Sequence, residues 1–250
     1  MAAVALVEQN NLSSSQSTKI SCRLCALNKI CFPGQIQCKV SSSIEEIIIR
    51  HYPKKKNENW FVKGDKANSL IAVRSGAIKT YSLSEEGSEQ ICDFHLPGEL
   101  VGLDAIAGGV HGNYAANVED SSVCEIPLDR LQEISKEEGS LSWELAKLIS
   151  GHLEIKQRQI NLLTRKNAEE RVAAFLCDYS DRLIKRGYSG SSIKLNMSRS
   201  DLAQYLGLTL ETTSRIFSRL SKEGLISVNG KQVGFLNLQA LKNKIKTIDL

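Results

Sequence analysis

Three cysteines stand close together near the start of the chain, at Cys22, Cys25 and Cys31. They lie within ten residues of a polar segment that we predict to be a loop-like arm. Thiolates at such short spacing are typical of a zinc site or an iron–sulfur cluster, and each of these requires a fourth donor. The residue types leave that donor open among Cys38, Cys92, Cys124, Cys177 and a histidine.

The kind of site is also open. Cys38 favours zinc, because it would complete a local set of four cysteines. The neighbouring cations Lys19, Arg23 and Lys29 favour a cluster, because they could offset the negative charge of its thiolates. A third interpretation is that the thiols take part only in redox chemistry.

The composition describes a folded chain without a disulfide framework. Its 250 residues are 42% hydrophobic and 24% charged, which fits one long or two ordinary soluble domains and excludes a disordered chain. The seven cysteines are an odd number in a chain without an export signal. No apolar run approaches the ~18 residues that cross a bilayer. We therefore expect a cytoplasmic protein with no membrane contact.

The part of the chain that follows the cysteine arm contains a regular series of glycines. Gly64, Gly76, Gly87, Gly98 and Gly108 follow one another at intervals of 12, 11, 11 and 10 residues, each beside a turn-forming neighbour. Short apolar or alternating segments lie between them, at 69–73, 77–81, 90–94 and 121–126. This pattern predicts an antiparallel barrel or jelly roll over about residues 40–130, opened by a helix at 44–49.

After Pro127 the apolar residues recur at helical spacing, which predicts one long helix over roughly 140–165. Asn167 with Glu170 indicates the capped start of the next helix. Charge also changes here: residues 1–168 carry 19 Lys/Arg against 20 Asp/Glu, whereas residues 169–250 carry 13 against 8. A positively charged small domain is where a polyanion would bind, although it is also compatible with an ordinary solvated surface.

The last eighty residues have the pattern of a winged helix-turn-helix. Ser198 and Asp201 begin a short helix that ends at Gly207, and a second helix follows over about 210–221. We predict that the second helix buries Leu210, Thr213, Phe217 and Leu220. Two short strands, 226–228 and 233–235, flank Asn229-Gly230, which predicts a type I′ hairpin.

The exposed face of the second helix carries Glu211, Ser214 and Arg215. Arginine can donate to guanine O6 and N7, glutamate can accept from cytosine N4, and serine permits close approach. The alternative is an ordinary surface ion pair between Glu211 and Arg215. If the helix reads bases, the expected phosphate contacts are Arg199, Arg219, Lys222 and Lys231.

A cysteine arm, a glycine-paced barrel, a long helix and a winged helix-turn-helix, in this order, resemble the CRP/FNR superfamily of bacterial transcription regulators over nearly the whole chain. Within it the sequence is most similar to the FNR branch. The matching stretches are the three arm cysteines, Val123–Pro127, Phe94–Leu96 with Asp104–Ile106, Lys166–Arg171 and Tyr205–Thr209.

The resemblance implies an oxygen-responsive regulator, an activator and repressor that binds a palindromic promoter site as a homodimer and works with RNA polymerase. It implies one [4Fe-4S] cluster per subunit, held by Cys22, Cys25, Cys31 and Cys124, with DNA binding falling in oxygen. It argues against a cyclic nucleotide, because residues 111–116 lack the Arg-Ser pair of the cyclic-AMP branch. The alternative is a CRP-type regulator that senses a small ligand or zinc.

Nothing in the sequence indicates an enzyme. The four histidines, at positions 51, 95, 111 and 152, have no metal-ligand spacing, and no phosphate loop or nucleophile elbow is present.

The long helix carries a stripe at coiled-coil spacing, formed by Ile149, Leu153, Lys156, Ile160 and Leu163. It predicts pairing with a second copy, in which two facing Lys156 ammonium groups would repel and so oppose dimerisation. In the alternative, the stripe packs on its own barrel with Lys156 at the wet edge.

These elements predict an α+β protein with an N-terminal jelly-roll β-barrel of the cyclic-nucleotide-binding type. The expected divisions are a cysteine-rich arm at 1–40, a sensory barrel at 41–138, a dimerisation helix at 139–166 and a winged helix-turn-helix DNA-binding domain at 167–250.

Overall fold

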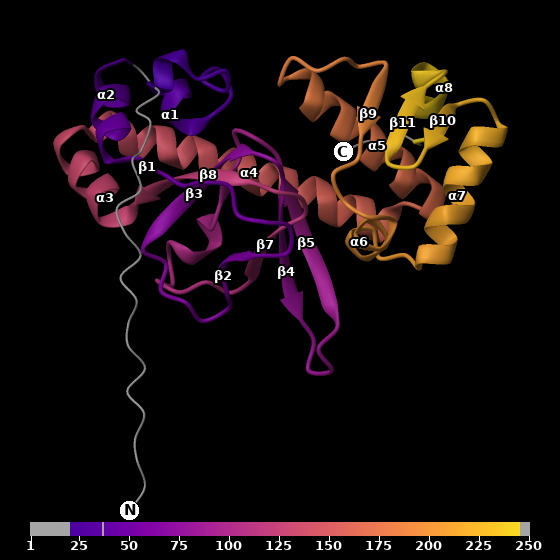
Figure 1. Ribbon diagram of the computed structural model, residues 1–250, viewed down its shortest axis with the longest axis horizontal. Coiled ribbons are helices and arrows are strands. Elements are labelled where there is room, and N and C mark those ends of the chain that lie inside the picture. The colour runs from indigo at the N-terminus through magenta and orange to yellow at the C-terminus, as the bar shows by residue number, and fades with distance from the viewer. Residues whose placement is uncertain (1–20, 37, 246–250) are drawn as a thin grey trace, which may run out of the picture.

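The computed structural model describes residues 21–36 and 38–245, and for residues 38–41 it describes the backbone alone. Its first part is a sandwich of two four-stranded antiparallel sheets (Figure 1). One sheet has the order β1 (Ile49–Arg50), β8 (Ser122–Pro127), β3 (Ser69–Ser75) and β6 (Leu100–Val101); the other has β2 (Asn59–Phe61), β7 (Tyr114–Asn117), β4 (Ile78–Leu83) and β5 (Glu89–His95). The strand order is not sequential, as in a jelly roll, so the predicted fold class is confirmed.

The two sheets enclose a small core that includes Phe61, Ile71, Val73, Ile78 and Val123. The glycine series marks turns, as the spacing predicts. Gly76 has a φ of 79°, and a Cβ there would lie 2.2 Å from Ser121 Oγ. Only glycine fits that turn without moving the neighbouring strand connection.

Short helices cover the outer face of the β1–β8–β3–β6 sheet (Figure 1). They are η1 (Cys22–Leu24), α1 (Phe32–Gln35), α2 (Cys38–Ile47) and α3 (Leu128–Glu137), while the short η2 (Leu103–Ala105) follows β6. The helix predicted at 44–49 therefore starts earlier and ends before Ile49, which is the first residue of β1. Ile44 and Ile48 are buried in the cluster under these helices, whereas Ile49 points outward.

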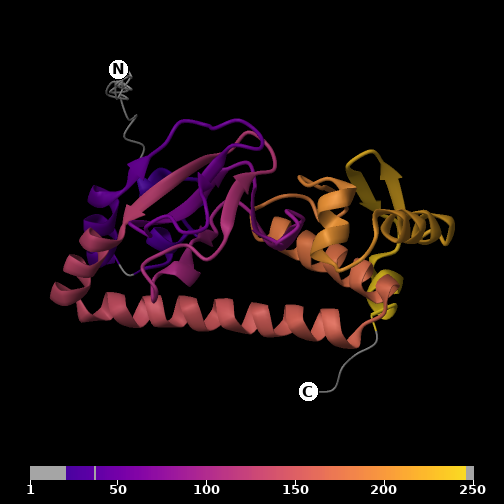
Figure 2. The ribbon, with the colours of Figure 1, turned by 90° about the horizontal axis from the view of Figure 1, so that it is seen from below.

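The long helix α4 (Gly139–Arg165) runs beside the barrel and continues to the C-terminal unit (Figure 2). Leu141 in its first turn is fully buried. Further along, Ile149, Leu153 and Ile160 have 45%, 59% and 59% of their surface exposed, so this part of the predicted stripe does not pack on the barrel.

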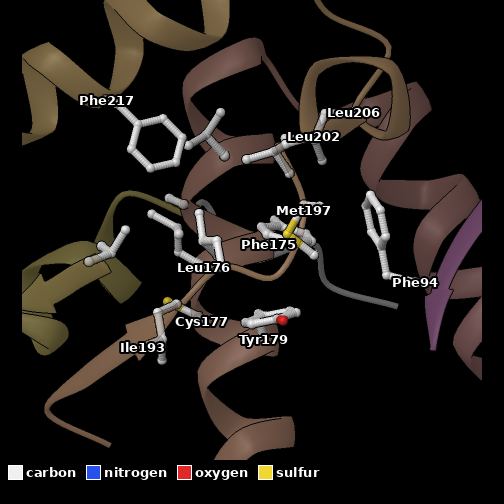
Figure 3. Close-up of a cluster of buried hydrophobic side chains, with 14 of the residues drawn as sticks. Phe94, Phe175, Leu176, Cys177, Tyr179, Ile193, Met197, Leu202, Leu206 and Phe217 are labelled. Carbon is white, nitrogen blue, oxygen red and sulfur yellow. The ribbon is translucent and has the colours of Figure 1, made fainter. Parts of the chain in front are cut away.

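The C-terminal unit contains α5 (Ala168–Ile184), β9 (Ser192–Lys194), α6 (Arg199–Tyr205), α7 (Leu210–Lys222), β10 (Ile226–Asn229), β11 (Gln232–Phe235) and α8 (Leu238–Asn243). Capping boxes are present at Asn167 with Glu170 and at Ser198 with Asp201, as the sequence predicts. Its hydrophobic core also takes in Phe94 and Leu96 from the barrel, and Figure 3 shows Phe94 beside the helices.

Two local predictions for this unit are wrong. Leu210 is 50% exposed, and Ile216 takes its place on the buried face of α7. The hairpin loop consists of Gly230 and Lys231, because Asn229 pairs with Gln232. Glycine at the first loop position fits a type II′ turn, and this register pairs Val228 with Val233 where the predicted one would oppose Val228 with Lys231.

Among the described residues, no helix combines the length and the apolar character that crossing a bilayer requires.

Candidate functional site

Cys22, Cys25, Cys31 and Cys124 line one cavity between the arm and the outer face of the barrel. Cys22 is the first residue of η1 and Cys25 directly follows its last residue. The Ser21 hydroxyl caps the start of η1. Cys31 is the N-cap of α1, directly before the buried Phe32. The structure thus brings the arm thiols to the barrel cysteine that the family resemblance implies as their partner.

Cys124 reaches the cavity because of strand alternation in β8. Its neighbours Val123 and Glu125 face the other side, where Val123 belongs to the core between the sheets. Cys124 itself packs against the outer cluster that includes Phe32 and Ile36 of the arm. The face that carries Cys124 is therefore the outer one, covered by the arm.

An arginine stands among the thiols. Arg50 pairs in register with Cys124, and its Nη2 lies 3.7 Å from Cys22 Sγ. Arg50 and Arg74 could not be predicted as neighbours of the thiols from the sequence, because they lie in strands outside the arm. The cations expected to balance the thiolates are placed differently: Arg23 and Lys29 are exposed, and Lys19 lies outside the described residues.

The four thiols do not share one environment. Burial, together with the smaller effects of the nearby Cys124, Cys22 and Cys25, raises the pKa of Cys31 to about 12. Burial also raises the pKa of Cys22 and of Cys124, and Arg50 opposes both shifts. These surroundings favour the neutral thiols of Cys22, Cys31 and Cys124, so a metal group that requires thiolates must displace protons to bind.

The other candidate donors lie elsewhere. Cys92 is in β5 with its Sγ 3.7 Å from Asn113 Oδ1, and Cys177 is buried in the core of the C-terminal unit. The side chain of Cys38 is outside the described residues. Within the described part of the chain, no three His, Cys, Asp or Glu side chains are arranged to hold a single metal ion.

Replacing Arg50 by methionine should raise the pKa of the Cys22 thiol, because the guanidinium that stabilises its thiolate is removed. We expect alkylation of Cys22 in the metal-free protein to slow by about threefold at pH 8, measured by mass spectrometry. Arg23→Met is the matched control, because Arg23 is exposed in the same arm. An unchanged Cys22 rate would show that Arg50 does not act on the thiol.

The second site is the exposed face of α7. Glu211, Ser214, Arg215, Arg219 and Lys222 line one shallow hollow of the surface. Thr213, Ile216, Phe217 and Leu220 hold the opposite face in the core. Glu211 and Arg215 form a 2.7 Å ion pair, with 76% and 68% of their side chains exposed. The surface ion pair that was the alternative interpretation is therefore present in the protein without DNA. Such an exposed pair contributes only about 0.5 kcal/mol to stability, so it does not prevent either side chain from binding a base.

The four expected phosphate contacts differ in availability. Lys222 is exposed in the hollow, and Arg219 pairs with Glu169 at 2.9 Å. Arg199 stacks over the Phe217 ring at 3.8 Å, and the Lys231 ammonium donates to the carbonyl of Asn196 at 2.7 Å. Lys222 is the residue whose charge is least committed to the protein.

The ammonium group of Lys156 points to strand β5 of its own barrel, and not outward to where a second copy of α4 would lie. Its Nζ lies 2.6 Å from Asp93 Oδ2 and 3.3 Å from the carbonyl of Cys92, both in β5. Lys156 lies at the border of the stripe, and its long side chain reaches the barrel while Ile149, Leu153 and Ile160 stay exposed. In the single chain Lys156 thus follows the alternative, with its side chain against the barrel, and its role as a brake on dimerisation stays a prediction. Leu163, the last residue of the stripe, is half-buried.

A jelly-roll domain, a long helix and a winged helix-turn-helix define a DNA-binding transcription regulator, and comparison with known proteins gives the same class. Residues 51–138 match the cyclic nucleotide-binding domain, and residues 170–244 match the Crp-like helix-turn-helix domain.

The chain belongs to the CRP/FNR family of transcription regulators, and it is not an enzyme. It is 42% identical over 222 residues to the fumarate and nitrate reduction regulatory proteins of Salmonella typhimurium and Escherichia coli K12, with 89% of each chain covered. Among solved structures, FixK2 from Bradyrhizobium japonicum is similar with a TM-score of 0.75 and 32% identity, covering 81% of this chain and all of that one.

Proposed function

We propose that this regulator responds to oxygen through a [4Fe-4S] cluster, one per subunit, held by Cys22, Cys25, Cys31 and Cys124. The observation that carries the proposal is that these four thiols, and no other described cysteine, line one cavity. The donor set fits, since four cysteine thiolates are the usual ligands of such a cluster. A bound cluster would supply iron that oxygen can attack.

The arm is well placed to affect dimerisation. Phe32 and Ile36 of the arm share a hydrophobic cluster with Leu141 in the first turn of α4. Ligands from both arm and barrel would hold these anchors in place, and the same helix exposes Ile149, Leu153 and Ile160. We propose that α4 pairs with a second copy along this stripe, so that the homodimer presents two α7 helices to a palindromic promoter.

Activation of transcription would further require RNA polymerase, and repression would require only occupation of the promoter; both follow from the family. We do not propose a cyclic nucleotide. His111, which opens the stretch that lacks the Arg-Ser pair, is buried and stacked on Phe61 with 3.6 Å between ring centroids.

The deciding experiment is purification without oxygen, with iron, sulfide and the visible spectrum measured before and after air. Duplex binding is measured on the same samples. We expect about four irons per chain, a dimer, and a loss of specific DNA binding in air. A colourless protein that contains one zinc per chain and binds DNA equally in air would refute the oxygen response and favour the alternative, a CRP-type regulator that senses zinc or a small ligand.

Base reading by α7 gives a prediction of its own. Arg215→Ala should weaken binding to the cognate duplex by about 1–3 kcal/mol and relax preference at one base pair, because a guanidinium fork reads guanine. Lys222→Ala, on the same exposed face, should weaken all duplexes alike and lower the salt slope by about one. Equal losses for Arg215→Ala on cognate and random duplexes would make Arg215 a phosphate contact.

A further inference from the structure

The turn Leu96–Leu100, between β5 and β6, contacts the cysteine arm and the C-terminal unit at the same time. Gly98 lies at its centre with a φ of 92°. A Cβ at Gly98 would lie 3.0 Å from Ile30 Cγ1 and 3.6 Å from the backbone nitrogen of Cys31. The arm therefore rests directly on this turn, at the residue before one of its cysteines.

The flanks of the turn hold α5. Glu99 accepts hydrogen bonds from Arg182 Nη2 and Arg186 Nη2, each at 2.6 Å. Arg186 Nε also donates to the carbonyl of Pro97 at 2.7 Å, and Arg182 Nη2 donates to the carbonyl of Phe94. Arg182 in the last turn of α5 and Arg186 in the turn that follows it thus clamp a single carboxylate and the backbone around it.

This clamp is well shielded from water. Arg186 has 6% of its side chain exposed, Arg182 20% and Glu99 28%. Burial disfavours the charged carboxylate, but the two arginines outweigh it and hold the pKa of Glu99 below its usual range. Charges paired in such surroundings have few alternative partners, so movement of the turn must be followed by α5 or must break the clamp.

The two leucines at the ends of the turn pack into different hydrophobic clusters, one on the side of the C-terminal unit and one on the side of the arm. Leu96 belongs to the cluster formed by α5, α6 and α7, whereas Leu100 belongs to the cluster that contains Phe32 and Ile36 of the arm. Five consecutive residues therefore join two cores. The backbone N–H of Gly98 also donates to the carbonyl oxygen of Val73 at 2.8 Å, and Val73 lines the cysteine cavity.

We infer that the Leu96–Leu100 turn is a coupling element within one subunit, through which the position of the cysteine arm sets the position of the helix-turn-helix, independently of dimerisation. Ile30 is the positioning residue on the arm side, and Glu99 with Arg182 and Arg186 transmits its position to α5. The effect of oxygen on this coupling rests on the proposed function. The contacts that make the coupling do not, because they are formed by protein residues alone.

The test replaces Ile30 by alanine, with Ile30→Val as the conservative rescue and Leu24→Ala as the matched control, since Leu24 is 82% exposed in the same arm. Hydrogen exchange is measured in the full-length protein, in cluster-free and cluster-loaded forms. Ile30→Ala should speed amide exchange in 96–100 and in 182–187 by about fivefold or more in both forms. Ile30→Val and Leu24→Ala should leave it unchanged.

The second readout is DNA binding at matched cluster content and matched dimer fraction. Ile30→Ala should weaken it at least several-fold, and combining it with Arg186→Lys should add less than the two separate effects, because both break one path. Unchanged exchange in 182–187, or fully additive effects on binding, would overturn the inference. A wild-type protein that takes up no cluster would refute the proposed function, while the exchange comparison in cluster-free protein would still decide the coupling.

Discussion

Replacing Cys124 by serine should empty the cluster site, reducing iron and sulfide in anaerobically purified protein to about a tenth or less of the wild-type content. The serine hydroxyl is a poor substitute for the thiolate, and the remaining three donors all come from the arm. Specific DNA binding and the dimer fraction should fall together, whereas the unfolding temperature of the metal-free protein should change little, because Cys124 is only half-buried.

The matched variants are Cys38→Ser, Cys92→Ser and Cys177→Ser. Cys92 and Cys177 lie outside the cavity, so the Cys92→Ser and Cys177→Ser variants should retain the cluster. If Cys38→Ser emptied the site and Cys124→Ser left it full, the ligand set would be a local one within the arm. The barrel would then have no part in binding the metal group.

The second large effect is expected at the joint between α4 and β5. Lys156→Met leaves the carboxylate of Asp93, with 12% of its side chain exposed, without its 2.6 Å partner. Breaking a fully buried pair costs about 3–5 kcal/mol, and the 31% exposure of the Lys156 side chain reduces the expected loss to about 2 kcal/mol of unfolding free energy. Urea denaturation would measure it.

Lys147→Met is the control, because Lys147 pairs with Glu144 within the same helix and has 53% of its side chain exposed. It should change the unfolding free energy by less than about 0.5 kcal/mol. If Lys156→Met instead raised the dimer fraction in air with no loss of stability, the two lysines would face each other after all.

The same pair makes stability depend on acid. Burial raises the pKa of Asp93, but His95, Lys156 and Arg182 lower it to a net value of about 2. Burial lowers the pKa of His95 itself, so at pH 7 the positive charges are those of Lys156 and Arg182. Because the folded pKa lies below the unfolded value of about 3.9, this contribution is present above pH 4 and is lost as pH falls towards 2. In Lys156→Met the loss should begin at a higher pH.

The elements that could be predicted from sequence are those whose cause is local. Asn167 with Glu170 and Ser198 with Asp201 form their capping boxes within four residues, and the glycine series marks turns wherever it occurs. The hairpin loop shows where local signals end. Both Asn229-Gly230 and Gly230-Lys231 fit a two-residue turn, and the choice depends on which register brings apolar side chains together across the two strands.

Contacts between distant segments could not be read from the residues themselves. Spacing placed Lys156 in the seam, but its partner Asp93 lies in another element, 63 residues away in sequence. Residue types alone likewise left the partner of the arm cysteines open, and only the family resemblance pointed to Cys124. Arg50, Arg182 and Arg186 carried no signal at all, because an arginine on a strand or helix is ordinary until its partners are known.

The shared core around Phe94 and Leu96 bears on how such regulators can be recombined. Both residues belong to the barrel by sequence, yet they lie in the cluster that stabilises α5, α6 and α7, and Phe94 packs against Tyr205 with 5.3 Å between ring centroids. The barrel and the helix-turn-helix are therefore not interchangeable modules. A chimera cut in the loop after α4 would join two surfaces that had never been fitted to each other, so an exchange of DNA-binding specificity between relatives is better made by grafting the exposed face of α7 than by moving the whole unit.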